Sequence, residues 1–519
     1  MPYLAVALVV IIVFVLASLA ATYAYGRFAE AARGKPSHAL PRSGPDTEAD
    51  RIADRLRAGR EAGSGLALIA SNLDAFAVRV LSARAAGRSL DAMYYIWGDD
   101  LTGRLMLGEL LGAADRGVRV RLLVDDIGVS LSDRTFLAVD RHPNIEVRMF
   151  NPTHARDKPF RRGVEMALRM LSVNRRMHNK AFVVDGQIAI VGGRNISDAY
   201  FDAGENSNFR DMDIVGVGEL AGQTERVFDE YWNSGVALPV RALAGRRPVR
   251  LGRLRGRIER LARSPQAAPY IRRLRERISV DRLVADEHVF WTQDARIVAD
   301  PPQKASGGGG KGHNRLLEEL VPLLAASQRQ VNVTSPYFIP GDRGADFFAA
   351  LVRKGVRVRV LTNSLAATDV AAVHGGYAPY RESLLIHGVE LYELKPTAGR
   401  ERLRLRGSSR ASLHTKAFTS DGEAGFVGSL NFDPRSVSLN TEMGVLFAVP
   451  GLVQAMDAIF EAEIQPEMSY ALSLDADGAL EWRGRSDGLE ERFEDEPEAS
   501  FGRKALATLV GLLPLESQL

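Results

Sequence analysis

Residues 178–195 read HNKAFVVDGQIAIVGGRN, and residues 414–431 repeat the pattern as HTKAFTSDGEAGFVGSLN. The two windows agree at nine of 18 positions without a gap. Unrelated sequences of ordinary composition would agree at about one. An internal repeat of this strength indicates two similar halves in one chain.

The repeat extends upstream of these windows. RGVRVR at residues 116–121 is echoed by KGVRVR at 354–359, and the glycines of the two copies precede their histidines by 61 and 59 residues. In the first half, residues 90–97 and 118–124 have the composition of strands, and 103–116 has the leucine spacing of a helix. This alternation predicts an α/β fold with two similar halves, each a mixed β-sheet flanked by helices.

Composition changes sharply outside the two halves. The predicted segments are a transmembrane anchor at 3–25, a linker at 26–65, a first domain at 66–240, an Arg-rich connector at 241–285, a second domain at 286–470, an acidic linker at 471–500 and an amphipathic tail at 501–519. The connector fits either a solvated helical segment or a surface resting on anionic lipid headgroups. The tail fits either a membrane-surface helix or a helix packed on the body.

The N-terminal segment is long and apolar. No residue from 3 to 25 is charged, and about 20 such residues in a helix span a bilayer. A cleaved signal peptide is the alternative, because Ser-Leu-Ala at 18–20 resembles a processing site. No basic residue precedes the run, so we expect a retained single-pass anchor in a bacterial inner membrane. Basic residues after the run mildly favour a cytoplasmic body, but the sequence leaves open which side of the membrane the catalytic body occupies.

Bulk composition excludes several kinds of chemistry. The chain contains no cysteine, so disulfides, thiolate nucleophiles and zinc–thiolate sites are ruled out. The formal net charge of +3 over 519 residues is too small to indicate nucleic-acid binding, and no nucleic-acid partner is expected.

Each repeat carries the residue types that metal-free phosphodiester cleavage requires. A nucleophile must attack phosphorus, an acid must protonate the leaving oxygen, and cations must neutralise the other oxygens. Imidazole can fill the first two roles near neutral pH. Residues i and i+2 of a strand share a face, so His178 would lie beside Lys180, and His414 beside Lys416.

A hairpin turn at the Asp-Gly of each repeat would return the following asparagine, Asn195 or Asn431, to the face of its histidine. We expect no metal and no cofactor, because a histidine alternating with a lysine lacks the ligand set of a zinc site.

The full pattern, His-x-Lys-x4-Asp-x6-Gly-(Gly/Ser)-x-Asn, resembles the duplicated motif of the phospholipase D superfamily over roughly residues 67–470. The resemblance implies that the halves share one cleft, that one histidine forms a phosphohistidine and that the other acts as acid and then base. It implies catalytic or phosphate-holding roles for His178, Lys180, Asn195, His414, Lys416, Asn431 and Ser429, and structural roles for Asp185, Asp421, Gly192, Gly193 and Gly428. Gly193 stands where the second copy has Ser429, so the site should be asymmetric.

Two carboxylates follow the motifs at comparable intervals, in NFRDMD at 208–213 and NTEMG at 440–444. A catalytic histidine usually needs a carboxylate on its second nitrogen to fix its tautomer. We therefore predict that Asp211 orients His178 and that Glu442 orients His414. Surface charges at the start of a strand are the alternative.

Other stretches resemble the bacterial cardiolipin synthases, in particular their C branch. These are YYIWGDD at 94–100, SPYFIPG at 335–341, TNSLAATDV at 362–370 and Gly-Tyr at 376–377. The resemblance implies phosphatidyl transfer, with His178 attacking phosphatidylglycerol and His414 protonating the leaving glycerol. The aromatic residues Tyr95, Trp97, Tyr337 and Phe338 are predicted to contact substrate, although core strands would also explain them.

The expected partners are phospholipids, namely phosphatidylglycerol and either a second phosphatidylglycerol or phosphatidylethanolamine, and the bilayer itself. The motif is shared by enzymes with other substrates, so three alternatives stay open. They are a phospholipase D-type hydrolase, a membrane-tethered nuclease and a non-catalytic lipid-binding scaffold. The sequence leaves the oligomeric state open.

Overall fold

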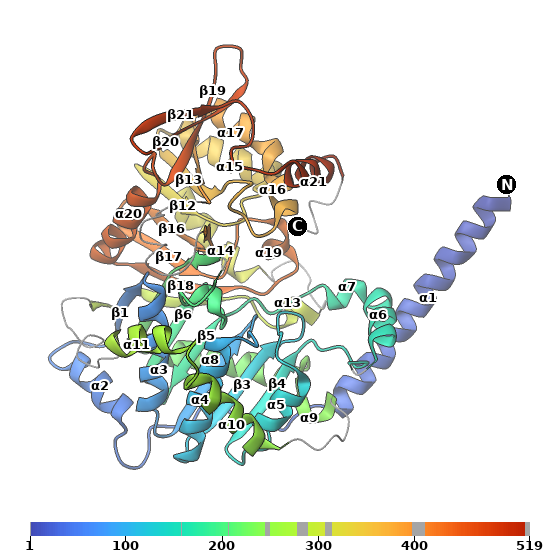
Figure 1. The fold of residues 1–519 in the computed structure, drawn as a ribbon, viewed down its shortest axis with the longest axis vertical. Helices are drawn as coiled ribbons and strands as arrows, with labels where there is room; N and C mark the ends of the chain where they lie inside the picture. Colours follow the sequence, from blue (N-terminus) through green and yellow to red (C-terminus); the bar gives the residue numbers. More distant parts are fainter. Residues whose placement is uncertain are drawn as a thin grey trace.

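Two mixed β-sheets, one from each half of the chain, form the body of the molecule (Figure 1). The computed structural model describes residues 2–156, 158–205, 207–243, 250–277, 289–306, 314–396 and 410–513. The first sheet has the order β10 (Phe290–Thr292), β1 (Ser64–Ile69), β8 (Asp213–Gly218), β6 (Ile188–Gly192), β5 (Ala181–Val184), β2 (Ser89–Tyr94), β3 (Arg119–Asp125), β4 (Ile145–Phe150) and β9 (Ala237–Pro239).

The second sheet repeats this arrangement. Its order is β11 (Ala295–Ala299), β18 (Met443–Ala448), β17 (Ala424–Gly428), β16 (Ala417–Ser420), β12 (Gln330–Thr334), β13 (Arg357–Asn363), β14 (Glu390–Leu394), β19 (Ser469–Leu474), β20 (Leu480–Ser486) and β21 (Leu489–Phe493). In each half three strands are parallel, β2–β3–β4 or β12–β13–β14, and the hairpin strands β5–β6 or β16–β17 lie antiparallel beside them. The predicted fold of two similar halves is confirmed.

Helices flank both sheets. In the first half they are α3 (Asn72–Ala85), α4 (Leu101–Asp115), α5 (Asp133–Val139), α6 (Pro159–Leu168), α7 (Met170–Val173), the 3-10 turn η1 (Asp198–Tyr200), α8 (Glu219–Trp232) and α9 (Val240–Leu243). In the second half they are α13 (Gln303–Ser306), α14 (Arg315–Ala325), α15 (Gly341–Arg353), α16 (Ala371–Tyr377), the 3-10 turn η3 (Ala378–Tyr380), α17 (Arg381–Ile386), α19 (Pro434–Ser438) and α20 (Pro450–Glu463).

An apolar core joins the two halves. Met93, Val191 and Ile214 of the first sheet belong to the same buried cluster as Val427 and Val445 of the second. Each sheet also has a separate core beneath its own helices. Burial of a shared apolar cluster is the main favourable term in docking two domains, so it holds the halves in a fixed relation.

The linker predicted at 471–500 is wrong. Strands β19, β20 and β21 lie in or reach into this segment and extend the second sheet at its edge. Their apolar residues alternate with charged ones, and Leu472 and Trp482 are buried while Glu490 and Glu491 lie on the outer strand. That alternation is typical of an edge strand with one solvated face, and it gives the segment its acidic composition.

The linker predicted at 26–65 contains a packed helix, α2 (Glu48–Arg57), which buries Ile52 and Leu56 against the first sheet. The predicted start of the second domain at 286 is also wrong. β10 belongs to the first sheet and β11 to the second, so the chain crosses between halves just before β11.

The Arg-rich connector forms α10 (Leu251–Ala262) and α11 (Ala268–Arg277), which pack on α4 and α3 through Ile258, Tyr270 and Leu274. Residues 278–285 of the predicted connector and the glycine run at 307–310 lie outside the described residues.

The two ends of the chain carry apolar helices. α1 (Pro2–Ala31) projects from the body (Figure 1). Its span from Tyr3 to Ala31 is long and apolar enough to cross a membrane, and a signal sequence also meets these two criteria. α21 (Phe501–Gly511) packs on α16 through Ala507 and Val510, while Leu509 and Leu512 stay exposed. Residues 514–519 of the predicted tail lie outside the described part of the chain.

The motif aspartates fix the hairpin turns to the neighbouring strand. Asp185 accepts hydrogen bonds from the backbone N–H groups of Gly87, Arg88 and Ser89 at 2.7–2.9 Å. Asp421 accepts from the corresponding residues Gln328, Arg329 and Gln330 at 2.7–2.9 Å. These contacts support the structural role predicted for both residues, because each carboxylate satisfies three donors where β2 or β12 begins.

We expect Asp185→Asn to lower the free energy of unfolding by about 2 kcal/mol, because the amide cannot accept all three hydrogen bonds from these backbone donors, of which the Ser89 N–H is buried. Thermal unfolding of the full chain in detergent measures the loss. Asp487→Asn is the matched control, since Asp487 has the same left-handed backbone in an exposed hairpin turn. Equal melting temperatures for the two variants would contradict the structural role.

Candidate active site

Backbone pairing between the halves places both motif histidines. Met177 forms a parallel bridge with Thr441, and the His178 N–H donates to the Thr441 carbonyl at 2.9 Å. In the mirrored position, β15 (Arg410–Leu413) pairs in parallel with β7 (Ser207–Arg210), and the His414 N–H donates to the Arg210 carbonyl at 2.7 Å. Each histidine therefore lies at the point where its own half is hydrogen-bonded to the other half.

Each imidazole receives a carboxylate from the opposite half. His178 Nδ1 lies 2.8 Å from Glu442 Oε2, and His414 Nδ1 lies 2.6 Å from Asp211 Oδ2. The predicted pairing of Asp211 with His178 and Glu442 with His414 is thus wrong. The backbone pairing explains the exchange, because Glu442 follows the residue bonded to His178, and Asp211 follows the residue bonded to His414.

The lysines lie beside their histidines, as expected, but the strand begins only after them. Lys180 Nζ donates to the His178 carbonyl at 2.6 Å, and Lys416 Nζ donates to the His414 carbonyl at 2.6 Å. β5 starts at Ala181 and β16 at Ala417. All four side chains are buried, each less than a tenth exposed.

Both histidines and both lysines lie close enough for their charges to shift one another's pKa values, so they form one centre. Burial lowers the pKa of His178 to about 4, and the Glu442 carboxylate opposes this shift. Burial also lowers the pKa of His414, and the charges of Lys416, Lys180 and His178 add to that effect. Burial lowers the pKa of Lys416 to about 8. An anion placed among these groups would relieve their mutual repulsion.

The two carboxylates differ in their surroundings. Burial would raise the pKa of Glu442, but His178 and Lys180 outweigh it, and the net pKa is lowered. Burial raises the pKa of Asp211 despite the nearby charges of Lys416 and Arg194. Ser429 contributes to the difference, because its hydroxyl donates to Glu442 Oε2 at 2.5 Å.

Ser429 was predicted to help hold the phosphate. Its hydroxyl donates to the Glu442 carboxylate, and the contact with phosphate stays a prediction. In the first half, a Cβ on Gly193 would lie 2.3 Å from Asp211 Oδ1, so only glycine admits this carboxylate. A Cβ on Gly192 or Gly428 would meet the backbone of the neighbouring strand at about 2.4–2.5 Å. These contacts support the structural role predicted for the three glycines.

Tyr200 is a residue of this centre that sequence reasoning missed. Its hydroxyl lies 3.3 Å from His414 Nε2, and it accepts a hydrogen bond from Asn195 Nδ2 at 2.9 Å. Asn195 Oδ1 accepts from the Ile96 N–H, so this amide is held within the first half. The signal in the sequence was a difference between the repeats. The fifth residue after the motif asparagine is Tyr200 in the first half but Ser436 in the second.

Asn431 is placed differently from Asn195. Its Oδ1 is buried and has no hydrogen-bond partner among the described residues. A buried acceptor without a partner is costly in a finished interior and is expected where a ligand completes the contact. Asn431 therefore keeps its predicted place among the residues available to substrate.

The four aromatic residues predicted to contact substrate fall into two groups. Trp97 and Phe338 occupy equivalent positions, both are almost fully buried, and each forms a bridge to the residue after the motif asparagine. Both belong to the apolar cores, as the alternative of core strands implies, and a contact with substrate stays a prediction for them. The Tyr95 ring packs edge-on against His178 at 5.1 Å between centroids, and Tyr337 donates to Asp369 at 2.9 Å.

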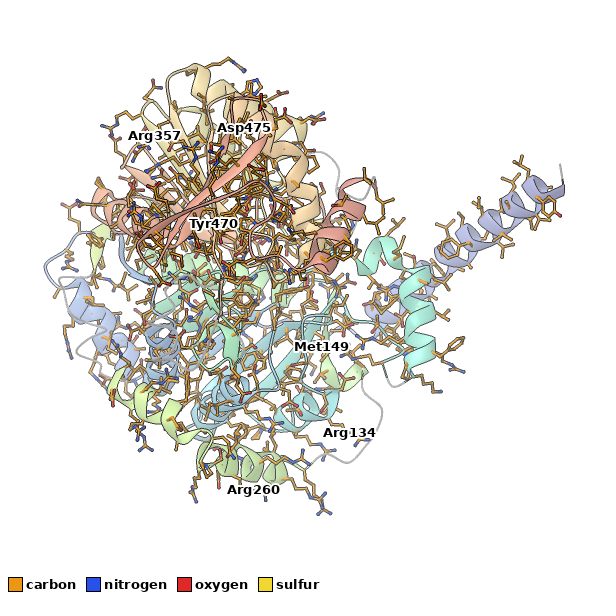
Figure 2. All side chains as sticks on the ribbon, turned by 45° about the horizontal axis from the view of Figure 1, so that its top comes forward. Arg134, Met149, Arg260, Arg357, Tyr470 and Asp475 are labelled. Carbon is orange, nitrogen blue, oxygen red and sulfur yellow. The ribbon has the colours of Figure 1, made fainter. Side chains whose placement is uncertain are left out.

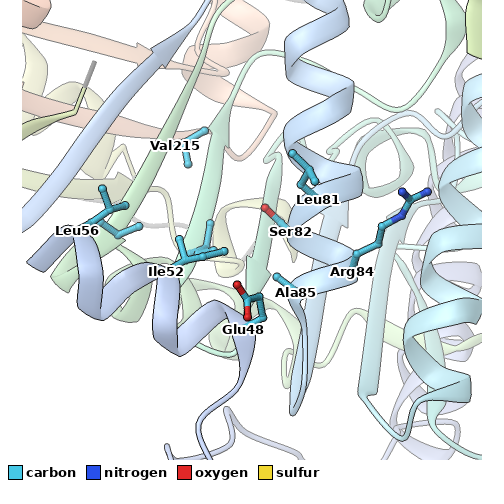
Figure 3. Close-up of a pocket in the computed structure, with 10 residues that line it drawn as sticks. Glu48, Ile52, Leu56, Leu81, Ser82, Arg84, Ala85 and Val215 are labelled. Carbon is cyan, nitrogen blue, oxygen red and sulfur yellow. The ribbon is translucent and has the colours of Figure 1, made fainter. Parts of the chain in front are cut away.

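Two other features lie outside this centre. A cavity of about 180 Å³ between α2, α3 and the first sheet is lined mainly by apolar residues such as Ile52, Leu56 and Val215 (Figure 3). In the second half His374, Glu393 and Glu496 cluster closely enough for a metal, but Arg381 lies among them at 2.9 Å from Glu393 and 2.7 Å from Glu496. That guanidinium supplies the positive charge and makes the cluster an ion-pair network.

The fold and this centre define a two-domain protein of the phospholipase D type. Residues 82–232 and 320–464, together more than half of the chain, match the family described as cardiolipin synthase, PLD-like domain. The chain therefore belongs to the cardiolipin synthase family of PLD-like proteins. The prediction of a phosphatidyltransferase of this family is confirmed.

Individual relatives agree with the family. The sequence is 40% identical to cardiolipin synthase C of Escherichia coli (strain K12) over 459 residues, which cover 87% of this chain and 95% of the relative. It is 26% identical to a cardiolipin synthase of Staphylococcus aureus (strain Mu50) over 352 residues, covering 67% of this chain and 57% of the relative. The structure of phosphatidylserine synthase from Haemophilus influenzae Rd KW20 has the same fold, with a TM-score of 0.53 at 16% identity over 82% of this chain and 92% of that one.

The buried histidines should make the protein less stable in mild acid. The pKa of His178 is about 4 in the folded chain, below its ordinary value of 6.5, so the unfolded chain binds more protons between these values. The contribution of the neutral His178 ring to the free energy of unfolding is therefore fully present above pH 6.5. It falls towards pH 4 by about 1.4 kcal/mol per pH unit for one such group. Replacing the ring by an uncharged amide in His178→Gln should flatten this part of the curve.

Melting temperatures of the full chain at pH 7 and pH 5 measure the effect. The exposed His387, which directly follows α17, provides the control variant, His387→Gln, which should keep the wild-type slope. A slope unchanged in His178→Gln would show that the imidazole is already protonated in the folded chain.

Proposed function

We propose that this protein makes cardiolipin by transferring a phosphatidyl group from phosphatidylglycerol to a second phospholipid through a phosphohistidine. The observation that carries the proposal is the buried centre in which each of two imidazoles takes its carboxylate from the opposite half. With Nδ1 hydrogen-bonded to a carboxylate, each neutral ring has its proton on Nδ1 and a lone pair on Nε2. A neutral Nε2 is the form that attacks phosphorus.

The two lysines supply the attraction for the phosphate. Burial lowers the pKa of Lys180, and the charge of Lys416 adds to that effect across the centre. A phosphodiester anion between the two lysines would therefore be stabilised by both ammonium groups. Asn431, whose amide oxygen bonds to no group in the part of the chain that the structure describes, can accept a hydrogen bond from a substrate hydroxyl.

We assign the nucleophile to His178 and the acid to His414. Among the described residues, the hydrogen bonds of the His178 ring all involve Nδ1, which leaves Nε2 available for attack. His414 Nε2 is instead held by the Tyr200 hydroxyl. A group that transfers protons benefits from a fixed hydrogen-bond partner on the transferring nitrogen, whereas a nucleophile does not.

The reaction then runs in two balanced steps. His178 Nε2 forms a bond to the phosphorus of phosphatidylglycerol while the bond from phosphorus to the glycerol oxygen breaks. That oxygen takes the Nε2 proton of His414, which enters this step as an imidazolium beside the Asp211 carboxylate and leaves it neutral. A second lipid alcohol next loses its proton to His414 Nε2 and attacks the phosphorus, and the phosphorus–nitrogen bond breaks. If water replaces that alcohol, the product is phosphatidic acid.

Phosphatidylethanolamine can replace phosphatidylglycerol only as the donor, with release of ethanolamine, because the accepting lipid must supply the hydroxyl group of a phosphatidylglycerol headgroup. The similarity to cardiolipin synthase C supports cardiolipin as the product, and α1 supports retention of the chain at a bilayer as a single-pass anchor. Two bilayer lipids as donor and acceptor suit a buried, anion-attracting centre better than a charged polymer does.

His178→Ala and His414→Ala should each lower cardiolipin formation roughly a thousandfold or more, because each removes a whole step. The measurement uses the full chain in vesicles of phosphatidylglycerol with and without phosphatidylethanolamine, with lipid products quantified by mass spectrometry. Release of ethanolamine identifies phosphatidylethanolamine as a donor, and phosphatidic acid as the main product would favour the hydrolase. His387→Gln is the control.

The same variants decide which histidine is the nucleophile. His414→Ala should still accumulate a phosphatidyl group on the protein, while His178→Ala should not. Unchanged cardiolipin formation in both variants would reject the proposal, and degradation of an oligonucleotide by the wild-type chain would favour a nuclease.

Tyr200→Phe removes only the hydroxyl, and we expect roughly a tenfold lower kcat with little change in KM. The hydroxyl stabilises neutral His414, so its loss should raise the His414 pKa and shift the corresponding limb of the pH–rate profile to higher pH. Tyr470→Phe removes a buried hydroxyl bonded to Glu498, far along the second sheet, and serves as the control. A pH profile identical to wild type would reduce Tyr200 to a packing role.

A further inference from the structure

The segment between β4 and His178 exposes an unusual number of apolar side chains. None of the ten residues of α6 is buried. Phe160 is 83% exposed and Leu171 is 82% exposed, and Val164, Met166 and Met170 are also exposed. A short amphipathic helix in a soluble protein normally buries its apolar side. We therefore expect this exposed surface to contact a partner outside the chain.

This segment packs against the C-terminal part of α1. The Arg169 guanidinium lies over the Tyr25 ring at 3.2 Å from its centroid, and the rings of Phe28 and His154 are 4.1 Å apart. α6 itself contacts α1, and Figure 1 shows α6 and α7 beside it. Tyrosine at the end of an apolar helix is typical of the boundary between lipid and water.

Basic residues accompany the apolar ones. Lys158 and Arg161 are exposed at the start of α6 beside Phe160. Glu165 is held by the backbone N–H groups of His154 and Ala155 and by Arg169, so its charge is compensated within the segment. Apolar side chains next to exposed cations match a bilayer that contains anionic lipids.

The segment is also tied rigidly to the catalytic centre. Arg435 of α19 donates to Asn174 Oδ1 at 2.9 Å, and Arg175 donates to the Lys304 carbonyl at 2.9 Å. Arg176 donates to Asp125 at 3.0 Å, two residues before His178. His178 is the seventh residue after Leu171, so even an extended chain would keep the two within about 25 Å of each other.

We propose that α6 and α7 form a docking surface for the anionic bilayer in which α1 is inserted, and that docking brings the catalytic centre to the level of the lipid headgroups. This inference rests on the proposed retention of α1 as an anchor. It adds a second contact with the membrane, and it makes the substrates of the centre lipids that stay in the bilayer during the reaction.

Because the chain has no cysteine, single cysteines can be introduced without background. Phe160→Cys and Leu171→Cys, labelled with an environment-sensitive fluorophore in the full chain, are placed in vesicles of phosphatidylglycerol and phosphatidylethanolamine with and without brominated acyl chains. We expect at least twofold quenching at both positions.

Arg260→Cys is the control for this measurement, because Arg260 is exposed on α10, on the side of the body away from the free end of α1 (Figure 2). Quenching at Arg260 equal to that at Phe160, or none at Phe160 and Leu171, would overturn the docking surface, whether or not the protein makes cardiolipin.

A second measurement tests the consequence for catalysis. The double variant Phe160→Glu and Leu171→Glu should turn over phosphatidylglycerol in vesicles at least tenfold more slowly, while its rate on a monomeric short-chain phosphatidylglycerol stays within twofold of wild type. Leu489→Glu, at an apolar residue that is 74% exposed on β21, is the matched control and should leave both rates unchanged. Equal loss on both substrates would mean that the charges disturb the fold, and equal retention would contradict docking.

Discussion

The structure depends on hydrogen bonds that cross between its halves. The chain before each histidine pairs with the chain before the opposite carboxylate, so neither half contains a complete catalytic pair. His178 without Glu442, or His414 without Asp211, would be a buried imidazole with no partner for its Nδ1 proton. Docking of the halves is therefore a condition for the chemistry as well as for stability.

The electrostatics of the centre follow from this arrangement. Two imidazoles and two ammonium groups share a buried volume with two carboxylates, and burial lowers the pKa of each basic group. Such a site is unfavourable when empty and improves when an anion enters, because the phosphate offsets the cations that burial has destabilised. Preorganised groups of this kind stabilise charge without reorganising during the reaction.

The duplicated halves have diverged at the positions that assign their tasks. Ser429 and Gly193 occupy the same motif position, yet one donates a hydrogen bond to a carboxylate and the other makes room for one. Tyr200 and Ser436 likewise follow the motif asparagines at the same interval, and Tyr200 reaches the ring of His414. A symmetric fold thus provides two histidines whose transferring nitrogens have different surroundings.

The sequence alone determined the repeat, the α/β character of both halves, the hairpins that carry the motifs, and the histidines and lysines themselves. It could do so because these depend on local spacing, such as the turn at Asp185 or the two-residue step from His178 to Lys180. The β19–β21 extension was missed because an edge strand with one solvated face has the composition of a linker.

The tertiary structure alone decided which carboxylate serves which histidine. The partners are 264 and 203 residues apart, and their pairing is set by how two separately formed sheets dock through a shared apolar cluster. It also decided that Trp97 and Phe338 are core residues and that Tyr200 belongs to the site. A local pattern contains no information about the relative placement of two domains, because that placement is the sum of many weak contacts between distant segments.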